Sequence, residues 1–112
     1  MLTSVDVDMS STRPVEWLRI LADPLRLQIV ELLAREALCT CHIVEMTGAR
    51  QTNVSNHLRL MRQAGIVEIE PHGRYTYYRL SAGVVRQLAG YLQALAAAAA
   101  IVDEADVRRP CP

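Results

Sequence analysis

A chain of 112 residues has the length of a single domain and leaves too little room for a substrate pocket beside a core. Its apolar content of 51% supports only a small core, so a dimer that shares its core would be unsurprising. The 12 basic residues are all arginine and balance 12 acidic residues. However, residues 50–86 hold six arginines against two glutamates, and this positive middle suits a surface that faces phosphates.

The first 13 residues are polar and show no helical periodicity, so we expect a flexible N-terminal arm over residues 1–13. They lack the basic start and apolar core of a signal peptide, which predicts a cytoplasmic protein with reduced cysteines. The three cysteines are unevenly spaced. This spacing favours ligands, redox thiols or small core residues over a disulfide framework.

Two helices are predicted next along the chain. The first is expected over residues 14–22, beginning at a proline. The second is expected over residues 24–33, with Asp23 as its N-terminal cap and Pro24 at its first position, where the missing N–H costs nothing.

A helix–turn–helix pattern follows. A short helix over residues 41–47 would be capped by Thr40 and stopped by Gly48, and a longer helix would run over residues 51–65. The stretches "IVEIE" and "RYTYYRL" then read as two strands joined by "PHG", a hairpin with a glycine at its turn.

The last predicted helix, over residues 84–102, is rich in alanine. Arg86, Gln87 and Gln93 interrupt it, and its larger apolar residues recur at helical spacing, so an amphipathic helix of a soluble protein is favoured over a membrane span. Residues 103–112 are predicted to form a flexible tail that carries Cys111.

This order of elements predicts a mainly α fold with a small β-hairpin (α+β). The same order is typical of a winged helix–turn–helix. We expect this DNA-binding and dimerisation domain to span residues 14–102. The flanking helices offer a place for two chains to pair. The residues expected at this homodimer interface are Leu18, Leu21, Leu88, Leu92 and Leu95.

The helix over residues 51–65 has the character of a DNA-reading helix. Successive residues turn about 100° around its axis, so Val54, Leu58 and Met61 form a core face. The opposite face lacks the glutamate and lysine that usually fill solvated faces, and its short polar groups and arginine suit base edges and phosphates. Arg74, beside the hairpin glycine, is expected to meet a phosphate or a minor groove. The expected DNA-binding residues are Gln51, Thr52, Asn53, Ser55, Asn56, Arg59 and Arg74.

The segments "LADPLRLQIVELL", "TNVSNHLRLMRQAGIVE" and "GRYTYYRLS" resemble the signature segments of the ArsR/SmtB family of metal-responsive winged-helix repressors. The resemblance runs from about Trp17 to Leu95. It implies a homodimer, a palindromic double-stranded operator, and release of the DNA when an effector binds.

Within that resemblance, "LCTC" matches the Cys-x-Cys pair of the arsenic-responsive and cadmium/lead-responsive branches, which implies that Cys39 and Cys41 bind the effector. Residues two apart in an extended segment point the same way, so both sulfurs could chelate one soft ion. If Thr40 is the cap, Cys41 lies at a helix N-terminus, which favours a thiolate. The third cysteine of many arsenic sensors is replaced here by Val44, so Cys111 is the remaining candidate ligand, from its own chain or its partner.

Three sulfurs suit trivalent arsenic or antimony, so the leading hypothesis is a repressor of a metal(loid)-resistance operon, released by arsenite or antimonite. A cadmium- or lead-responsive repressor is the first alternative, with His42 as an additional donor or an ordinary exposed histidine. A thiol-redox or persulfide sensor is the second. No enzyme is expected, since the sequence has no nucleotide loop and no nucleophile with a nearby base, and no organic cofactor or membrane partner is expected either.

Overall fold

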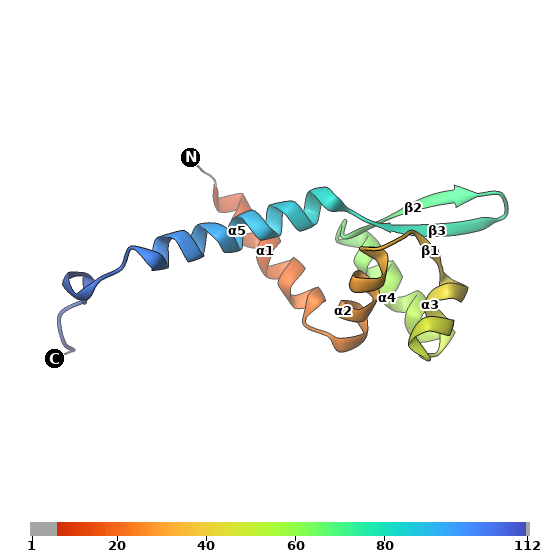
Figure 1. Ribbon diagram of the computed structural model, residues 1–112, viewed down its shortest axis with the longest axis horizontal. Coiled ribbons are helices and arrows are strands. Elements are labelled where there is room, and N and C mark those ends of the chain that lie inside the picture. The colour runs from red at the N-terminus through yellow and green to blue at the C-terminus, as the bar shows by residue number, and fades with distance from the viewer. Residues whose placement is uncertain (1–6, 112) are drawn as a thin grey trace.

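The computed structural model describes residues 7–111 (Figure 1). A bundle of short helices is followed by a β-hairpin wing and a long final helix, which confirms a mainly helical winged helix–turn–helix. In chain order the elements are α1 (Val7–Leu21), α2 (Pro24–Leu33), β1 (Leu38–Cys39), α3 (Thr40–Thr47), α4 (Gln51–Gln63), β2 (Val67–His72), β3 (Tyr75–Leu80), α5 (Ala82–Ala100) and a 3-10 turn (Glu104–Asp106).

Helix α1 begins at Val7, so the expected start of this helix at Pro14 is wrong. The expectation of a flexible arm is wrong for residues 7–13, which belong to the helix. The polar stretch before Pro14 lacks the apolar periodicity that predicts a helix. Elongation of a helix that is already packed requires no such periodicity, because only its first turn is costly to form. Residues 1–6 of the expected arm lie outside the described residues.

Helix α2 has the predicted start. The carboxylate of Asp23 accepts the backbone N–H of Arg26 at 3.0 Å, and Pro24 occupies the first turn. This hydrogen bond is the main reason why the pKa of Asp23 is below its usual value. The cap therefore fixes the corner between α1 and α2.

The sheet has three antiparallel strands in the order β1–β3–β2, one more than the predicted hairpin. The added strand β1 has only two residues, and its Cys39 pairs with Tyr77 of β3. The wing also differs in its ends: β2 runs through Pro71 to His72, so Gly73 and Arg74 form the turn. Pro71 is tolerated because β2 is an edge strand, where an N–H can be missing.

The core lies between the helices and the base of the wing. Gly48, with φ 74°, ends α3 in the left-handed region that glycine adopts freely, which turns the chain into α4 as predicted. The indole N–H of Trp17 donates to the carbonyl of Ala64 at 3.1 Å and joins α1 to the end of α4. The largest fully buried side chains are Ile29, Ile43, Val54, Leu58, Met61, Ile66 and Val67.

Helix α5 begins at Ala82, where the hydroxyl of Ser81 accepts the backbone N–H of Val84 at 3.3 Å. Leu88 is buried, but every residue from Ala89 to Ala100 is exposed, and the helix extends away from the rest of the molecule (Figure 1). Among the described residues, no helix is long and apolar enough to cross a membrane.

Candidate nucleic-acid interface and thiol site

Helix α4 presents the two faces that its sequence predicts. Val54, Leu58 and Met61 are fully buried. All the candidate DNA-binding residues of this helix are exposed: Gln51, Thr52, Asn53, Ser55, Asn56 and Arg59. Their amide, hydroxyl and guanidinium groups therefore form one accessible surface with the donors and acceptors that base edges and phosphates require.

One hydrogen bond organises this surface. A guanidinium N–H of Arg59 donates to the side-chain oxygen of Asn56 at 2.9 Å, one turn away on the same helix. The contact leaves the amide N–H groups of Asn56 and the remaining donors of Arg59 directed to solvent. The two side chains are thus paired before any ligand is bound.

Beneath α4, Arg26 joins three helices, an arrangement that the sequence does not predict. Its Nε donates to the carbonyl of Ile20 at the end of α1 at 2.6 Å, and its Nη1 lies 3.0 Å from Nδ1 of His57 on α4. Arginine has only donors, so His57 accepts with Nδ1. Through this hydrogen bond, His57 links α4 to the α1–α2 corner.

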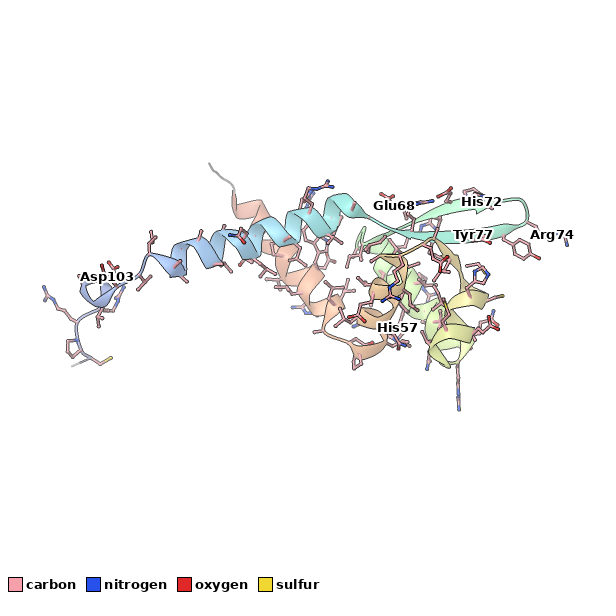
Figure 2. The ribbon with its side chains drawn as sticks, viewed as in Figure 1. His57, Glu68, His72, Arg74, Tyr77 and Asp103 are labelled. Atoms are coloured by element: carbon pink, nitrogen blue, oxygen red, sulfur yellow. The ribbon has the colours of Figure 1, made fainter. Side chains whose placement is uncertain are left out.

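The wing places Arg74 at its tip, in the turn itself (Figure 2). Arg74 is exposed and lies away from the ion pairs of the wing. Lower on the wing, Glu70 lies 2.7 Å from Arg79 and 2.9 Å from His72. Arg79 first, and His72 second, hold the pKa of Glu70 below its usual value.

The thiols lie at the junction between β1 and α3, and this junction differs from the predicted one. Cys39, with φ −88° and ψ 169°, is the N-cap of α3, whereas Thr40 is already helical. Pairing with β3 holds Cys39 in an extended conformation, so the helix starts one residue earlier than expected. The two cysteines therefore do not share an extended segment: Cys39 is 8% exposed and Cys41, on α3, faces solvent.

His42 contacts the buried thiol. Its Nδ1 lies 3.3 Å from the backbone nitrogen of Cys39, which donates to it, and 3.3 Å from Sγ of the same residue. The ring also packs edge-on against Tyr77 of β3, with centroids 5.8 Å apart. From the sequence alone, His42 is expected as a donor only in the cadmium/lead alternative, and no sequence signal places it beside Cys39.

Cys111 is far from this junction. It is exposed, and it lies in the segment after α5, at the opposite end of a molecule 62 Å long (Figure 1). Within the described part of the chain, no three histidine, cysteine, aspartate or glutamate side chains converge on one point. The structure of the single chain thus does not bring Cys111 to the other two candidate ligands.

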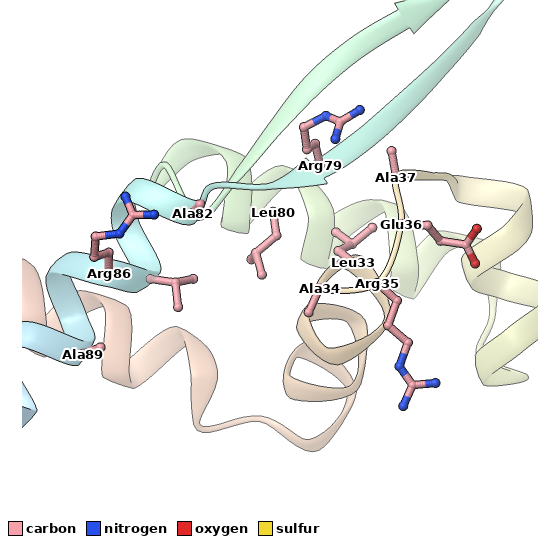
Figure 3. Close-up of a pocket in the computed structure, with 11 residues that line it drawn as sticks. Leu33, Ala34, Arg35, Glu36, Ala37, Arg79, Leu80, Ala82, Arg86 and Ala89 are labelled. Atoms are coloured by element: carbon pink, nitrogen blue, oxygen red, sulfur yellow. The ribbon is translucent and has the colours of Figure 1, made fainter.

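An open pocket of about 630 Å³ lies elsewhere, between the end of α2, the end of β3 and the start of α5 (Figure 3). Apolar side chains such as Leu33 and Leu80 share its lining with three arginines, Arg35, Arg79 and Arg86. Its lining includes no cysteine, histidine or hydroxyl group. It therefore offers no nucleophile paired with a base.

The predicted dimer residues fall into two groups. Leu18, Leu92 and Leu95 are 40%, 45% and 53% exposed, which leaves them available to a second chain. Leu21 is half-buried, and Leu88 is 7% exposed in the core of its own chain. Leu88 is therefore packed mainly inside its own chain, and its role at the interface stays a prediction.

A helix–turn–helix with an exposed polar recognition face and a β-hairpin wing defines the class of winged helix–turn–helix regulators. The family model described as "Bacterial regulatory protein, arsR family" matches residues 23–68. A relative described as an uncharacterized HTH-type transcriptional regulator of Methanocaldococcus jannaschii is 30% identical over 77 residues, 68% of this chain and 86% of that protein. The chain belongs to the ArsR family, a family of transcription regulators and not of enzymes.

Two further relatives carry names of resistance regulators. An arsenical resistance operon repressor of Escherichia coli K12 is 38% identical over 74 residues, 65% of this chain. A homolog of a cadmium resistance transcriptional regulatory protein of Staphylococcus aureus is 29% identical over 85 residues, 72% of this chain and 70% of that protein. The match covers 63% of the E. coli protein, less than two thirds of its length.

A solved structure agrees with the fold. It is the homodimeric winged helix–turn–helix DNA-binding domain of a possible ArsR-family transcriptional regulator from Mycobacterium bovis. It matches with a TM-score of 0.64 at 29% identity, over 82% of this chain and 88% of that one. The likeness covers both the helix–turn–helix and the wing.

Proposed function

We propose that this protein is a homodimeric transcriptional repressor that binds a palindromic double-stranded operator of a metal(loid)-resistance operon in the cytoplasm. We infer that As(III) or Sb(III), bound by the thiolates of Cys39 and Cys41, releases it from the DNA. The proposal rests chiefly on one observation: the Cys-x-Cys pair lies where β1, the wing strand β3 and α3 meet. The name of the E. coli relative supports the choice of arsenic.

The position of the thiols explains how binding of an ion could change the elements that contact DNA. Cys39 is buried while Cys41 is exposed, so one ion can bind both sulfurs only if Cys39 moves or the first turn of α3 rotates. The backbone of Cys39 is paired with Tyr77 of the wing, and α3 packs on α4. Such a movement would displace the wing and the recognition helix together, and two recognition helices would then no longer fit successive major grooves.

The energy required is modest. An ion shifts the two states of the repressor only through its different affinity for them. A 100-fold loss of operator affinity corresponds to ~2.7 kcal/mol of coupling. This coupling is a modest fraction of the free energy that ligation of a soft ion by thiolates can supply.

A third sulfur for a pyramidal As(III) site would come from Cys111. Because Cys111 lies at the opposite end of the single chain, the tail must fold back, or the partner subunit must supply it. The alternative inducer is Cd(II) or Pb(II), and the name of the S. aureus relative favours keeping this alternative. In both cases the pair formed by Cys39 and Cys41 is the centre of the site.

The test is operator binding by the full chain, with arsenite, antimonite, cadmium, lead and zinc added separately. The variants are Cys39→Ser, Cys41→Ser and, as the matched control, Cys111→Ser. We expect the first two to bind the operator and to ignore arsenite, because each removes one of the two sulfurs at the junction. Cys111→Ser should keep a weakened response, because it removes only the outer ligand.

Two outcomes would count against the proposal. Release of the Cys39→Ser and Cys41→Ser variants at the wild-type arsenite concentration would place the inducer site elsewhere. Release by cadmium or lead at lower concentrations than arsenite would replace As(III) by the alternative ion while keeping the thiol pair as the site.

A further inference from the structure

The exposed face of α4 carries a hydrogen-bonded pair of side chains, Asn56 and Arg59. Nη2 of Arg59 donates to Oδ1 of Asn56 at 2.9 Å, and both side chains are exposed. Residues three apart are neighbours on a helix surface, so the pair follows the axis of α4. A guanidinium group has only donors, so the amide oxygen of Asn56 must face Arg59. The orientation of the Asn56 amide is therefore fixed by its partner.

This contact makes adenine a poor partner for Asn56. An unpaired asparagine reads adenine by accepting from the N6 amino group with its oxygen while its nitrogen donates to N7. Here the oxygen already accepts from Arg59. It keeps a second lone pair, but an adenine amino group that approaches it meets the N–H groups of Arg59, and two donors repel each other.

Guanine suits the same pair of side chains. At its major-groove edge it presents two acceptors, N7 and O6, where adenine presents N7 and an amino group. The amide N–H groups of Asn56 and the remaining N–H groups of Arg59 are all donors, so they satisfy both guanine acceptors. Thymine offers one acceptor at this edge, and cytosine offers a donor. Guanine is thus the base that uses the donors of the pair most fully.

The surroundings of Arg59 keep its charge available. Helix α4 contains no acidic residue, and the ion pairs among the described side chains lie on the wing. Asn56 also holds the long side chain of Arg59 in one place before DNA binds, which lowers the entropy that the arginine loses on binding. Arg59 is therefore both free of a carboxylate and already positioned.

We propose that Asn56 and Arg59 form a guanine-reading pair, in which Arg59 contacts the base and Asn56 positions the arginine. The inference rests on the proposed function, since it takes α4 as the helix that enters the major groove, and it deepens that function by naming a base of the operator. Each subunit of the homodimer carries one pair. A palindromic operator then holds the guanine twice, once in each half-site.

The test selects binding sites from a randomised pool of double-stranded DNA with the wild-type full chain, Arg59→Met, Asn56→Ala and Asn56→Asp. The matched control is Arg62→Met, the same change at an exposed arginine of α4 outside the pair. Far-UV circular dichroism checks that each variant is folded. Fluorescence anisotropy at several salt concentrations then measures affinity for the selected site with guanine or adenine at the read position. Two analogues replace this guanine: one lacks N7, and inosine lacks only the amino group in the minor groove.

We expect the wild type and Arg62→Met to prefer guanine over adenine by at least about 10-fold, which corresponds to ~1.4 kcal/mol. Arg59→Met should lose this preference and gain affinity for adenine, because Oδ1 of Asn56 becomes free. Asn56→Asp keeps the acceptor for Arg59 and should keep the preference, whereas Asn56→Ala should reduce it. The analogue without N7 should weaken wild-type binding, and inosine should not.

A guanine preference that is equal in Arg59→Met and the wild type would overturn the inference. So would an equal loss of affinity for all sequences with a smaller salt slope, which would make Arg59 a phosphate contact. A wild-type preference in Asn56→Ala would remove the positioning role of Asn56. Failure of the wild type to select any sequence would instead overturn the proposed repressor itself.

Discussion

At the scale of single residues, the exposed face of α4 carries polar side chains that can form hydrogen bonds with a ligand. Thr52 and Asn56 lie opposite the buried face of α4. Their side chains are exposed and do not pack in the core. Asn56 also holds Arg59 through a hydrogen bond of 2.9 Å. A substitution at Asn56 therefore removes its own contacts and releases the arginine.

Substitution of the recognition face should weaken specific binding while leaving the fold intact. We expect Thr52→Ala and Asn56→Ala each to cost ~1–3 kcal/mol per lost base contact. Titration of operator and scrambled DNA by fluorescence anisotropy measures the effect, and Gln87→Ala on the exposed side of α5 is the control. Operator affinity equal to the control in both variants would remove the assignment of this face.

Arg74 should act differently, because it lies at the tip of the wing, away from the helix. We expect Arg74→Ala to weaken binding to all sequences alike and to reduce the salt dependence by about one phosphate contact, a change in slope of ~0.9. Binding curves at several salt concentrations measure this. A changed base preference with an unchanged salt slope would contradict the phosphate role.

Residue types and helical spacing were enough to predict the exposed face of α4 and its buried counterpart. They could not show that Arg26 joins α1 to His57, because the partners are up to 31 positions apart in sequence. Nor could they show that Cys39 is buried. That fact depends on pairing with Tyr77, which brings together residues 38 positions apart.

At the scale of elements, the helix–turn–helix depends on polar contacts as well as on the core. The α1–α2 corner is capped by Asp23 and joined to α4 through Arg26. Element types were predictable, but two features were not. A strand of two residues such as β1 has no periodicity of its own, and the part of α1 before Pro14 is carried by elongation from a packed helix.

Removal of the arginine that joins the three helices should destabilise the fold. Arg26→Met keeps the apolar stem but leaves the carbonyl of Ile20 and Nδ1 of His57 without this partner, at an expected cost of about 1–3 kcal/mol. Denaturant unfolding at a fixed protein concentration measures the change. Arg62→Met, at the exposed end of α4, should stay within about 0.5 kcal/mol. Equal unfolding midpoints for the two variants would show that the contact adds nothing to stability.

At the scale of the whole molecule, the single chain is elongated, 62 × 28 × 22 Å, because α5 extends beyond its last core residue, Leu88. An isolated helix rich in alanine is marginal in water, so most of its stability must come from packing. Among the described side chains, the exposed large apolar ones are Val85, Tyr91, Leu92 and Leu95 on α5, and Val15 and Leu18 on α1. In the proposed homodimer, these side chains would be covered by the partner subunit.

Two leucines one turn apart on α5 separate dimerisation from folding. Leu92 is 45% exposed in the single chain, so Leu92→Glu should place a charge in the dimer interface and yield folded monomers with little affinity for a palindromic site. Leu88 is 7% exposed, so Leu88→Glu should bury an unpaired carboxylate in the core and unfold the chain instead. Gln87→Glu, on the exposed side, should remain a folded dimer.

Sedimentation velocity gives the mass and far-UV circular dichroism gives the helix content. An intact dimer for Leu92→Glu would exclude this face of α5 from the interface, and a helical monomer for Leu88→Glu would show that Leu88 serves the partner subunit more than its own core.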